Sequence, residues 1–106
     1  MPKYLITASY TAEGAKGLLK EGGTQRRQAA DQVIKSAGGK MEAFYFAFGE
    51  DDAYVIIDAP DHASVAATAV AINASGAVHT KTVVLLTPEE IDQAVKKNVT
   101  YRAPGH

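Results

Sequence analysis

Five side chains are the candidates for ligand binding or chemistry in this sequence. They are Thr7, Ser9, Tyr45, Tyr54 and His79. The two tyrosines can frame a small-molecule pocket with their phenol groups as donors, and packing at an interface is the favoured alternative. The histidine is the only one predicted on a strand, where it could act as a general base. No nucleophile, base and orienting group converge, so the sequence leaves open whether any reaction is catalysed.

Three consecutive carboxylates, Glu50, Asp51 and Asp52, follow Gly49 between two apolar runs. Paired carboxylates can perform acid–base chemistry or bind a hard cation. Consecutive residues rarely converge on one point, however, and the segment lacks the spacing of an EF-hand loop. A solvated turn is therefore the favoured interpretation.

Metal and cofactor sites of the common kinds have no support in the residues. The chain contains no cysteine, which excludes disulfides, thiolate catalysis and cysteine metal sites. Its three histidines are scattered along the sequence. A P-loop, a nucleophile elbow and a dinucleotide fingerprint are all missing. We expect no metal site and no cofactor.

The charge pattern argues against nucleic acid and membranes as partners. The net charge is -1, so no global field attracts the protein to an anionic polymer or lipid surface. Arg26 and Arg27 alternate with acidic residues such as Asp31, which is typical of a solvated helix face. The start of the chain lacks the apolar run of a signal peptide, and no run could span a bilayer. We expect a cytoplasmic protein.

Apolar runs and helix caps predict the elements that position these residues. Strands are predicted over residues 3–10, 40–48, 53–59 and 78–86. Helix starts are predicted at the capping residues Thr11, Thr24, Asp61 and Thr87. The last of them carries a capping box closed by Glu90.

The resulting order is β-α-β-β-α-β with an added C-terminal helix. Two right-handed crossovers that share a central hairpin predict a ferredoxin-like α+β fold, with an antiparallel sheet and helices on one face. We expect one domain over residues 1–98 and a tail over residues 99–106. Tyr101 and Pro104 in that tail are predicted to reach over a partner subunit, with disorder as the alternative.

The central hairpin is predicted to turn over residues 49–52, which pairs Phe48 with Ala53 and places the phenylalanines under the helices. The opposite face then carries Ala43, Tyr45, Ala47, Tyr54, Ile56 and Asp58. An exposed face with several apolar side chains and a single charge is typical of an interaction surface. We expect a second sheet to pack there, and an ordinary tyrosine-bearing exposed sheet is the alternative.

The hairpin sequence FYFAFGEDD at residues 44–52 resembles the GYD domain family, a small bacterial family that is mostly uncharacterised. The segment DAPD at 58–61, the opening MPKY at 1–4 and the strand around Thr80 and Thr82 share the resemblance, which extends from residue 2 to about 97. The family's glycine, tyrosine and aspartate align with Gly49, Asp51 and Asp52, so this chain lacks the signature tyrosine.

The resemblance implies the dimeric α/β-barrel superfamily, in which two ferredoxin-like sheets pack face to face. It therefore implies a homodimer, or a higher oligomer built from it. The superfamily includes cofactor-independent monooxygenases, isomerases, haem-degrading enzymes and effector-binding modules. Three functions stay open: a dimer that binds a small molecule, which we favour, a small cofactor-independent enzyme, and a regulatory or structural interaction module. The chain has no tryptophan, which weakens the analogy to oxygenases that use one.

Overall fold

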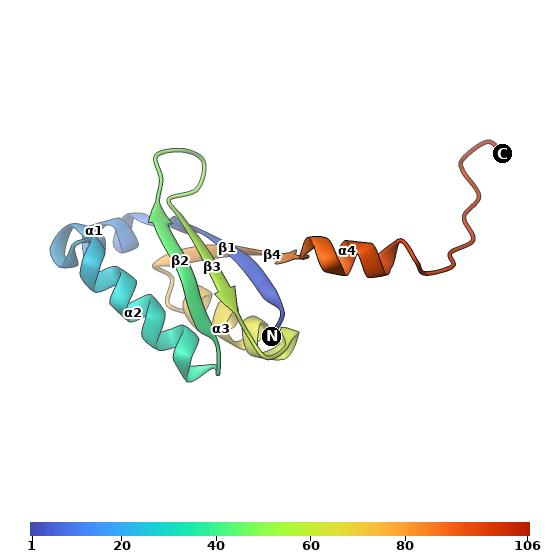
Figure 1. Ribbon diagram of the computed structural model, residues 1–106. Helices are drawn as coiled ribbons and strands as arrows, with labels where there is room; N and C mark the ends of the chain where they lie inside the picture. Colours follow the sequence, from blue (N-terminus) through green and yellow to red (C-terminus); the bar gives the residue numbers. More distant parts are fainter.

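Four strands form one antiparallel sheet in a computed structural model of the protein, which describes residues 1–106 (Figure 1). The strands are β1 (Lys3–Tyr10), β2 (Lys40–Phe46), β3 (Ala53–Asp58) and β4 (Val78–Leu85). Their order across the sheet is β2-β3-β1-β4, and every neighbouring pair is antiparallel. This arrangement confirms the predicted ferredoxin-like α+β fold.

The helices are α1 (Ala12–Glu21), α2 (Gly23–Ser36), α3 (His62–Ala74) and α4 (Pro88–Ala94). Three predicted caps are confirmed, because Thr11, Asp61 and Thr87 each accept a backbone hydrogen bond in the first turn. The predicted cap at Thr24 is wrong. Gly22 occupies the cap position of α2 instead, with φ +82°. Its N–H donates a hydrogen bond to the carbonyl of Leu18, so the same glycine ends α1 and begins α2. None of the helices has the length and hydrophobicity of a bilayer-spanning segment.

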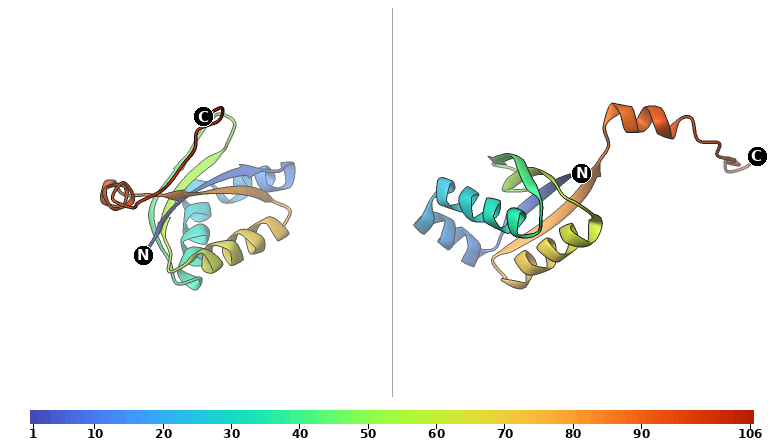
Figure 2. Two further views of the ribbon diagram at one scale, coloured as in Figure 1. Left: turned by 90° about the vertical axis from the view of Figure 1, so that its right-hand side faces the viewer. Right: turned by 60° about the horizontal axis from the view of Figure 1, so that its bottom comes forward.

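The hydrophobic core lies between the sheet and the helix layer. Figure 2 shows α2 and α3 on the same side of the sheet, which leaves the other side without a helical cover. Tyr4, Ile6 and Ile57 of the sheet pack against Ile34 of α2 and Val65 of α3, and each is at least 93% buried. Alternation along the strands produces this core, because every second side chain of β1 and β3 points toward the helices.

The predicted register of the central hairpin is wrong by two residues. Phe46, and not Phe48, pairs with Ala53, and β2 therefore ends at Phe46. The turn is displaced by one residue, because the N–H of Ala47 donates to the carbonyl of Asp52 and leaves residues 48–51 between them. Asp52 is also bonded to β1: its backbone N–H donates to the carbonyl of Ala8, and its carboxylate accepts from the N–H of Tyr10. A shift of two residues keeps Tyr45, Tyr54 and Ile56 on their predicted face. The prediction for Phe48 is wrong: it lies in the loop after β2 and is fully exposed, not buried under the helices.

The C-terminal segment, residues 86–106, leaves the sheet as an arm, visible at the right of Figure 1. Every residue from 88 to 106 is exposed. The arm raises the radius of gyration to 16.9 Å, whereas a compact domain of this length has about 13 Å.

Candidate functional site

The open face of the sheet, on the side away from the helices, carries an apolar row that crosses all four strands. Ala43 lies beside Ile56, Ile56 beside Leu5, and Leu5 beside Val83. Val83 is 50% exposed, and the other three side chains are half-buried although no helix covers them. A continuous apolar row at the middle of an uncovered sheet favours contact with another protein surface.

The five residues predicted from the sequence as candidates all lie on this open face. Tyr45 pairs with Tyr54, which pairs with Thr7, so these three form a row next to the apolar one. Ser9 pairs with His79 at the adjacent end of the sheet. Tyr45 is 72% exposed and Tyr54 is 39% exposed. Their role in binding a ligand stays a prediction, and none of them lines the pocket under the helices, described below.

Two of the three acidic residues of the β2–β3 loop, Asp51 and Asp52, are bonded to neighbouring strands. The Oδ1 atom of Asp51 lies 3.1 Å from Oγ of Ser9, which donates to it, and 3.4 Å from Nζ of Lys81. Asp52 accepts from the backbone of Tyr10 at 2.8 Å, so the two carboxylates diverge. No three His, Asp or Glu side chains of the chain gather where they could hold a metal ion.

Lys3 forms two ion pairs at the other end of the open face. Its Nζ lies 2.8 Å from Oε2 of Glu42 and 3.0 Å from Oδ1 of Asp58, and it thereby links β1, β2 and β3. The hydrogen bond to Glu42, followed by that to Asp58, raises the pKa of Lys3 above its ordinary value of 10.5. The charges at this end of the face are therefore paired with one another.

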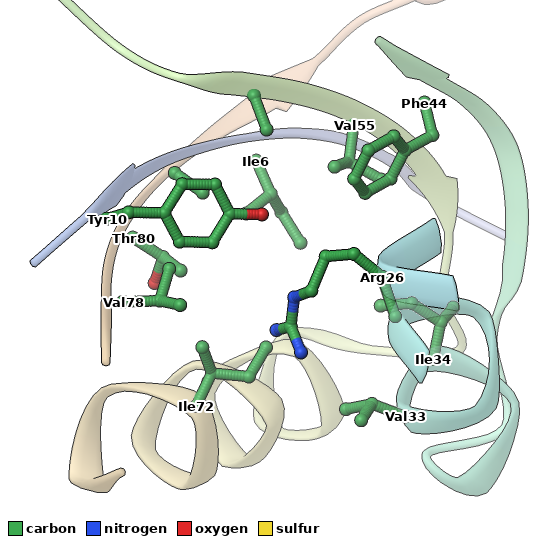
Figure 3. Close-up of a pocket in the computed structure, with 13 residues that line it drawn as sticks. Ile6, Tyr10, Arg26, Val33, Ile34, Phe44, Val55, Ile72, Val78 and Thr80 are labelled. Atoms are coloured by element: carbon green, nitrogen blue, oxygen red, sulfur yellow. The ribbon is translucent and has the colours of Figure 1, made fainter. Parts of the chain in front are cut away.

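A partly open pocket lies on the helix side, between the sheet, α2 and α3 (Figure 3). Its volume is about 60 Å³, several times the roughly 10–15 Å³ that one water molecule needs. Eleven of its thirteen lining residues are hydrophobic. They come from β1, β2, β3, β4, α2 and α3: Ile6, Ala8, Tyr10, Ala30, Val33, Ile34, Phe44, Ala53, Val55, Ile72 and Val78.

The two remaining lining residues are Arg26 and Thr80. The Thr80 hydroxyl accepts a hydrogen bond from the amide of Asn73 at 2.8 Å, which ties β4 to α3. Arg26 takes part in none of the chain's four ion pairs and in none of its side-chain hydrogen bonds. In Figure 3 it reaches from α2 across the hollow toward Ile72 of α3. The pocket therefore holds one charged group without a protein partner.

A wider groove of about 400 Å³ adjoins the pocket between α1, α2 and the end of α3. The two share Tyr10, Arg26 and Val33 among their walls, so the groove leads to the pocket. Glu13 and Glu21 of α1 line the groove, and neither forms an ion pair with Arg26.

Arg26 was predicted on a solvated helix face, but it lines this pocket, which was not predicted. The spacing of residues along α2 indicates that Arg26 lies on the apolar side of the helix. Arg26 precedes Ala30 by four residues and Val33 by seven, so it lies on the apolar stripe of α2. Arg27 lies about 100° further around the helix and is exposed.

Comparison with known proteins gives one match. The family model of the GYD domain matches residues 4–95, which include all of the sheet except Lys3 and all of its covering helices. No curated protein and no solved structure matches the chain.

Proposed function

The chain belongs to the GYD domain family, and we propose that it is a homodimer in which each subunit binds a small molecule in the pocket beneath its sheet. The observation that carries the proposal is the pocket itself. An apolar cavity with a few placed polar groups is the usual form of a small-molecule site. Here the cavity is lined by residues from six elements, and one of them is a cation without a protein partner.

Binding is favoured over turnover by the composition of the pocket walls. The thirteen lining residues include no histidine, aspartate or glutamate that could act as a general base. A cofactor-independent enzyme would need such a group within reach of its substrate. We therefore propose a binding protein, with an effector-binding role as the simplest use of the fold.

The homodimer is supported by the open face of the sheet. Its central apolar row, from Ala43 to Val83, is continuous across all four strands. Packing that row against the same row of a second copy would remove it from water, at roughly 25 cal/mol for each Å² of apolar surface buried. In that arrangement Tyr45 and Tyr54 would border the contact between the subunits, where tyrosine is a common residue.

The C-terminal arm favours a second copy as well. Helix α4 has seven residues, and a helix this short is unstable alone in water. It nevertheless carries a complete capping box and exposes Ile91 and Val95, which lie one turn apart on the same side. A helix with these features needs an apolar surface to pack against. We propose that the arm lies along the partner subunit, as predicted for Tyr101 and Pro104.

A filled-cavity variant tests the binding function. In Ala30→Leu the added side chain occupies the pocket, whereas Ala66→Leu adds the same group at an exposed position of α3. We expect small apolar compounds of a few carbon atoms to raise the melting temperature of the wild type and of Ala66→Leu. The Ala30→Leu protein should keep its fold and lose the response. The proposal is wrong if no compound stabilises the wild type, or if Ala30→Leu responds equally.

A further inference from the structure

We infer that the pocket takes a short apolar carboxylate, with its carboxylate on the guanidinium of Arg26 and its alkyl group among the apolar walls. This inference rests on the proposed function and names the class of ligand. It follows from three properties of the site: an uncompensated positive charge, hydrogen-bond donors without acceptors, and a small apolar volume.

The positive charge comes from Arg26. Its side chain is half-buried beside hydrophobic residues such as Val33 and Ile72, and it forms no ion pair. Removing a charge from water is costly unless an opposite charge compensates it. An arginine that turned outward, as its exposed neighbour Arg27 does, would avoid this cost. An anion bound from solution would provide the missing compensation.

The donors come from opposite walls of the pocket. In Figure 3 the Tyr10 ring extends from β1 with its hydroxyl toward the hollow, and Arg26 extends into the same hollow from α2. Tyr10 is hydrogen-bonded through its backbone N–H, and its hydroxyl has no acceptor in the chain. A carboxylate supplies acceptors only, and it matches the planar fork of a guanidinium with two parallel hydrogen bonds.

The volume limits the rest of the ligand. The pocket volume of about 60 Å³ is smaller than the roughly 150 Å³ cavity that holds benzene in a dry protein core. Its walls are aliphatic and aromatic, with Ile6, Phe44, Val55 and Val78 around the hollow. An alkyl group of a few carbons fits this space.

The adjoining groove selects against highly charged ligands. Glu13 and Glu21 line the groove that leads to Arg26, and their negative charges would repel a phosphate dianion more strongly than a monoanion. The same two carboxylates could face the ammonium group of an α-amino acid whose carboxylate lies on Arg26. A simple carboxylic acid and an apolar amino acid therefore share the proposed chemistry, and the test must distinguish them.

Three small probes separate these cases. Isovalerate is the proposed class, isovaleramide has the same shape without the charge, and valine is isovalerate with an added amino group. Calorimetric titrations of the wild type should show isovalerate binding at least about tenfold more tightly than isovaleramide, equivalent to about 1.4 kcal/mol. Tighter binding of valine than of isovalerate would assign the amino acid as the source, and the reverse order would assign the simple acid.

Two matched variants assign the effect to one residue. Arg26→Gln should lose the preference for the acid, and Arg27→Gln should keep it, although both remove one positive charge from α2. Circular dichroism of Arg26→Gln should match the wild type, because the Arg26 side chain makes no ion pair that its replacement could break, and its backbone bond to Gly22 is kept.

Two outcomes would overturn the inference while the proposed function stands. In the first, neutral compounds bind the pocket as tightly as their acids. In the second, Arg26→Gln and Arg27→Gln weaken acid binding equally, which would indicate a general charge effect. A failure of every probe, charged and neutral, would overturn the binding function itself.

Discussion

The hydroxyl of Tyr4 lies 2.6 Å from Nδ1 of His62, and the two rings meet edge to face at 81°. Tyr4 is 1% exposed at the centre of the sheet, whereas His62 is an exposed residue in the first turn of α3. The contact therefore fastens the start of α3 to β1. The hydroxyl donates to Nδ1 when the ring proton is on Nε2.

Substitutions of the two partners in this contact should reduce the stability of the fold by unequal amounts. Tyr4→Phe keeps the ring and leaves only the exposed His62 without its bond, so we expect a loss of about 1 kcal/mol in the free energy of unfolding. His62→Ala leaves the buried hydroxyl of Tyr4 without an acceptor and should cost more, about 1–3 kcal/mol. Urea unfolding of both variants checks the order, and equal losses would contradict it.

Two glycines of α1 should respond in opposite directions to alanine. A Cβ on Gly14 would lie 2.0 Å from the carbonyl oxygen of Ala77, which is backbone and cannot move freely. Gly14→Ala should destabilise the fold by about 1–3 kcal/mol through overpacking. Gly17 has no atom within 4 Å of such a Cβ, so Gly17→Ala should stabilise by about 0.5–1 kcal/mol. Thermal unfolding measures both, and a stable Gly14→Ala protein would contradict the close approach of α1 to the segment before β4.

The charge of Asp61 should make the stability of the fold depend on pH in the acid range. The backbone N–H of Ser64 donates to its carboxylate at 2.8 Å and holds the pKa of Asp61 below its ordinary value of 3.8. A carboxylate whose pKa is lower in the folded state stabilises the fold above pH 3.8, and the contribution disappears as the pH falls through the folded pKa. Asp61→Asn keeps a capping side chain without the charge. Its deficit in melting temperature should be present at pH 7 and should shrink below pH 3.8. A deficit that stays constant with pH would exclude this role of the charge.

The open face predicts the effect of a charge on assembly. Ile56 lies in the middle of the apolar row, between Leu5 and Ala43. Ile56→Lys should weaken dimerisation by roughly 100-fold or more, because an unpaired charge would be buried between the two sheets. Val70→Lys places the same charge on α3, where the native side chain is 69% exposed, and should leave the dimer intact. Light scattering at several concentrations measures both. A wild type that is monomeric at micromolar concentration would contradict the proposed homodimer.

The arm predicts a difference in proteolysis between dimer and monomer. Lys96, Lys97 and Arg102 are exposed trypsin sites in the isolated chain. If the arm packs on the partner, the wild type should be cleaved there more slowly than the monomeric Ile56→Lys protein. Val70→Lys, which remains dimeric, should behave as the wild type does. Equal rates in all three proteins would mean that the arm does not use the partner.

Several features of this structure could be predicted from the sequence because they depend on neighbouring residues. The capping box of α4 joins Thr87 to Glu90, only three positions away, and it forms as predicted. Alternation assigned Tyr54 and Ile56 to the open face even though the hairpin register was wrong by two residues. Side-chain direction repeats every second residue along a strand, so an even error leaves the faces unchanged.

The tertiary structure alone decided where the hairpin turns and where Arg26 points. The turn depends on bonds from Asp52 to β1, whose residues Ala8 and Tyr10 are more than forty positions away in the sequence. Arg26 and Arg27 are neighbours of the same type, and local rules treated both as members of a solvated face. They differ in burial because only the side of α2 that carries Arg26 faces the pocket. That pocket exists only where the sheet, α2 and α3 come together. Local chemistry in this chain determines its helix caps and the faces of its strands, whereas the position of a charge against a cavity depends on contacts between distant segments.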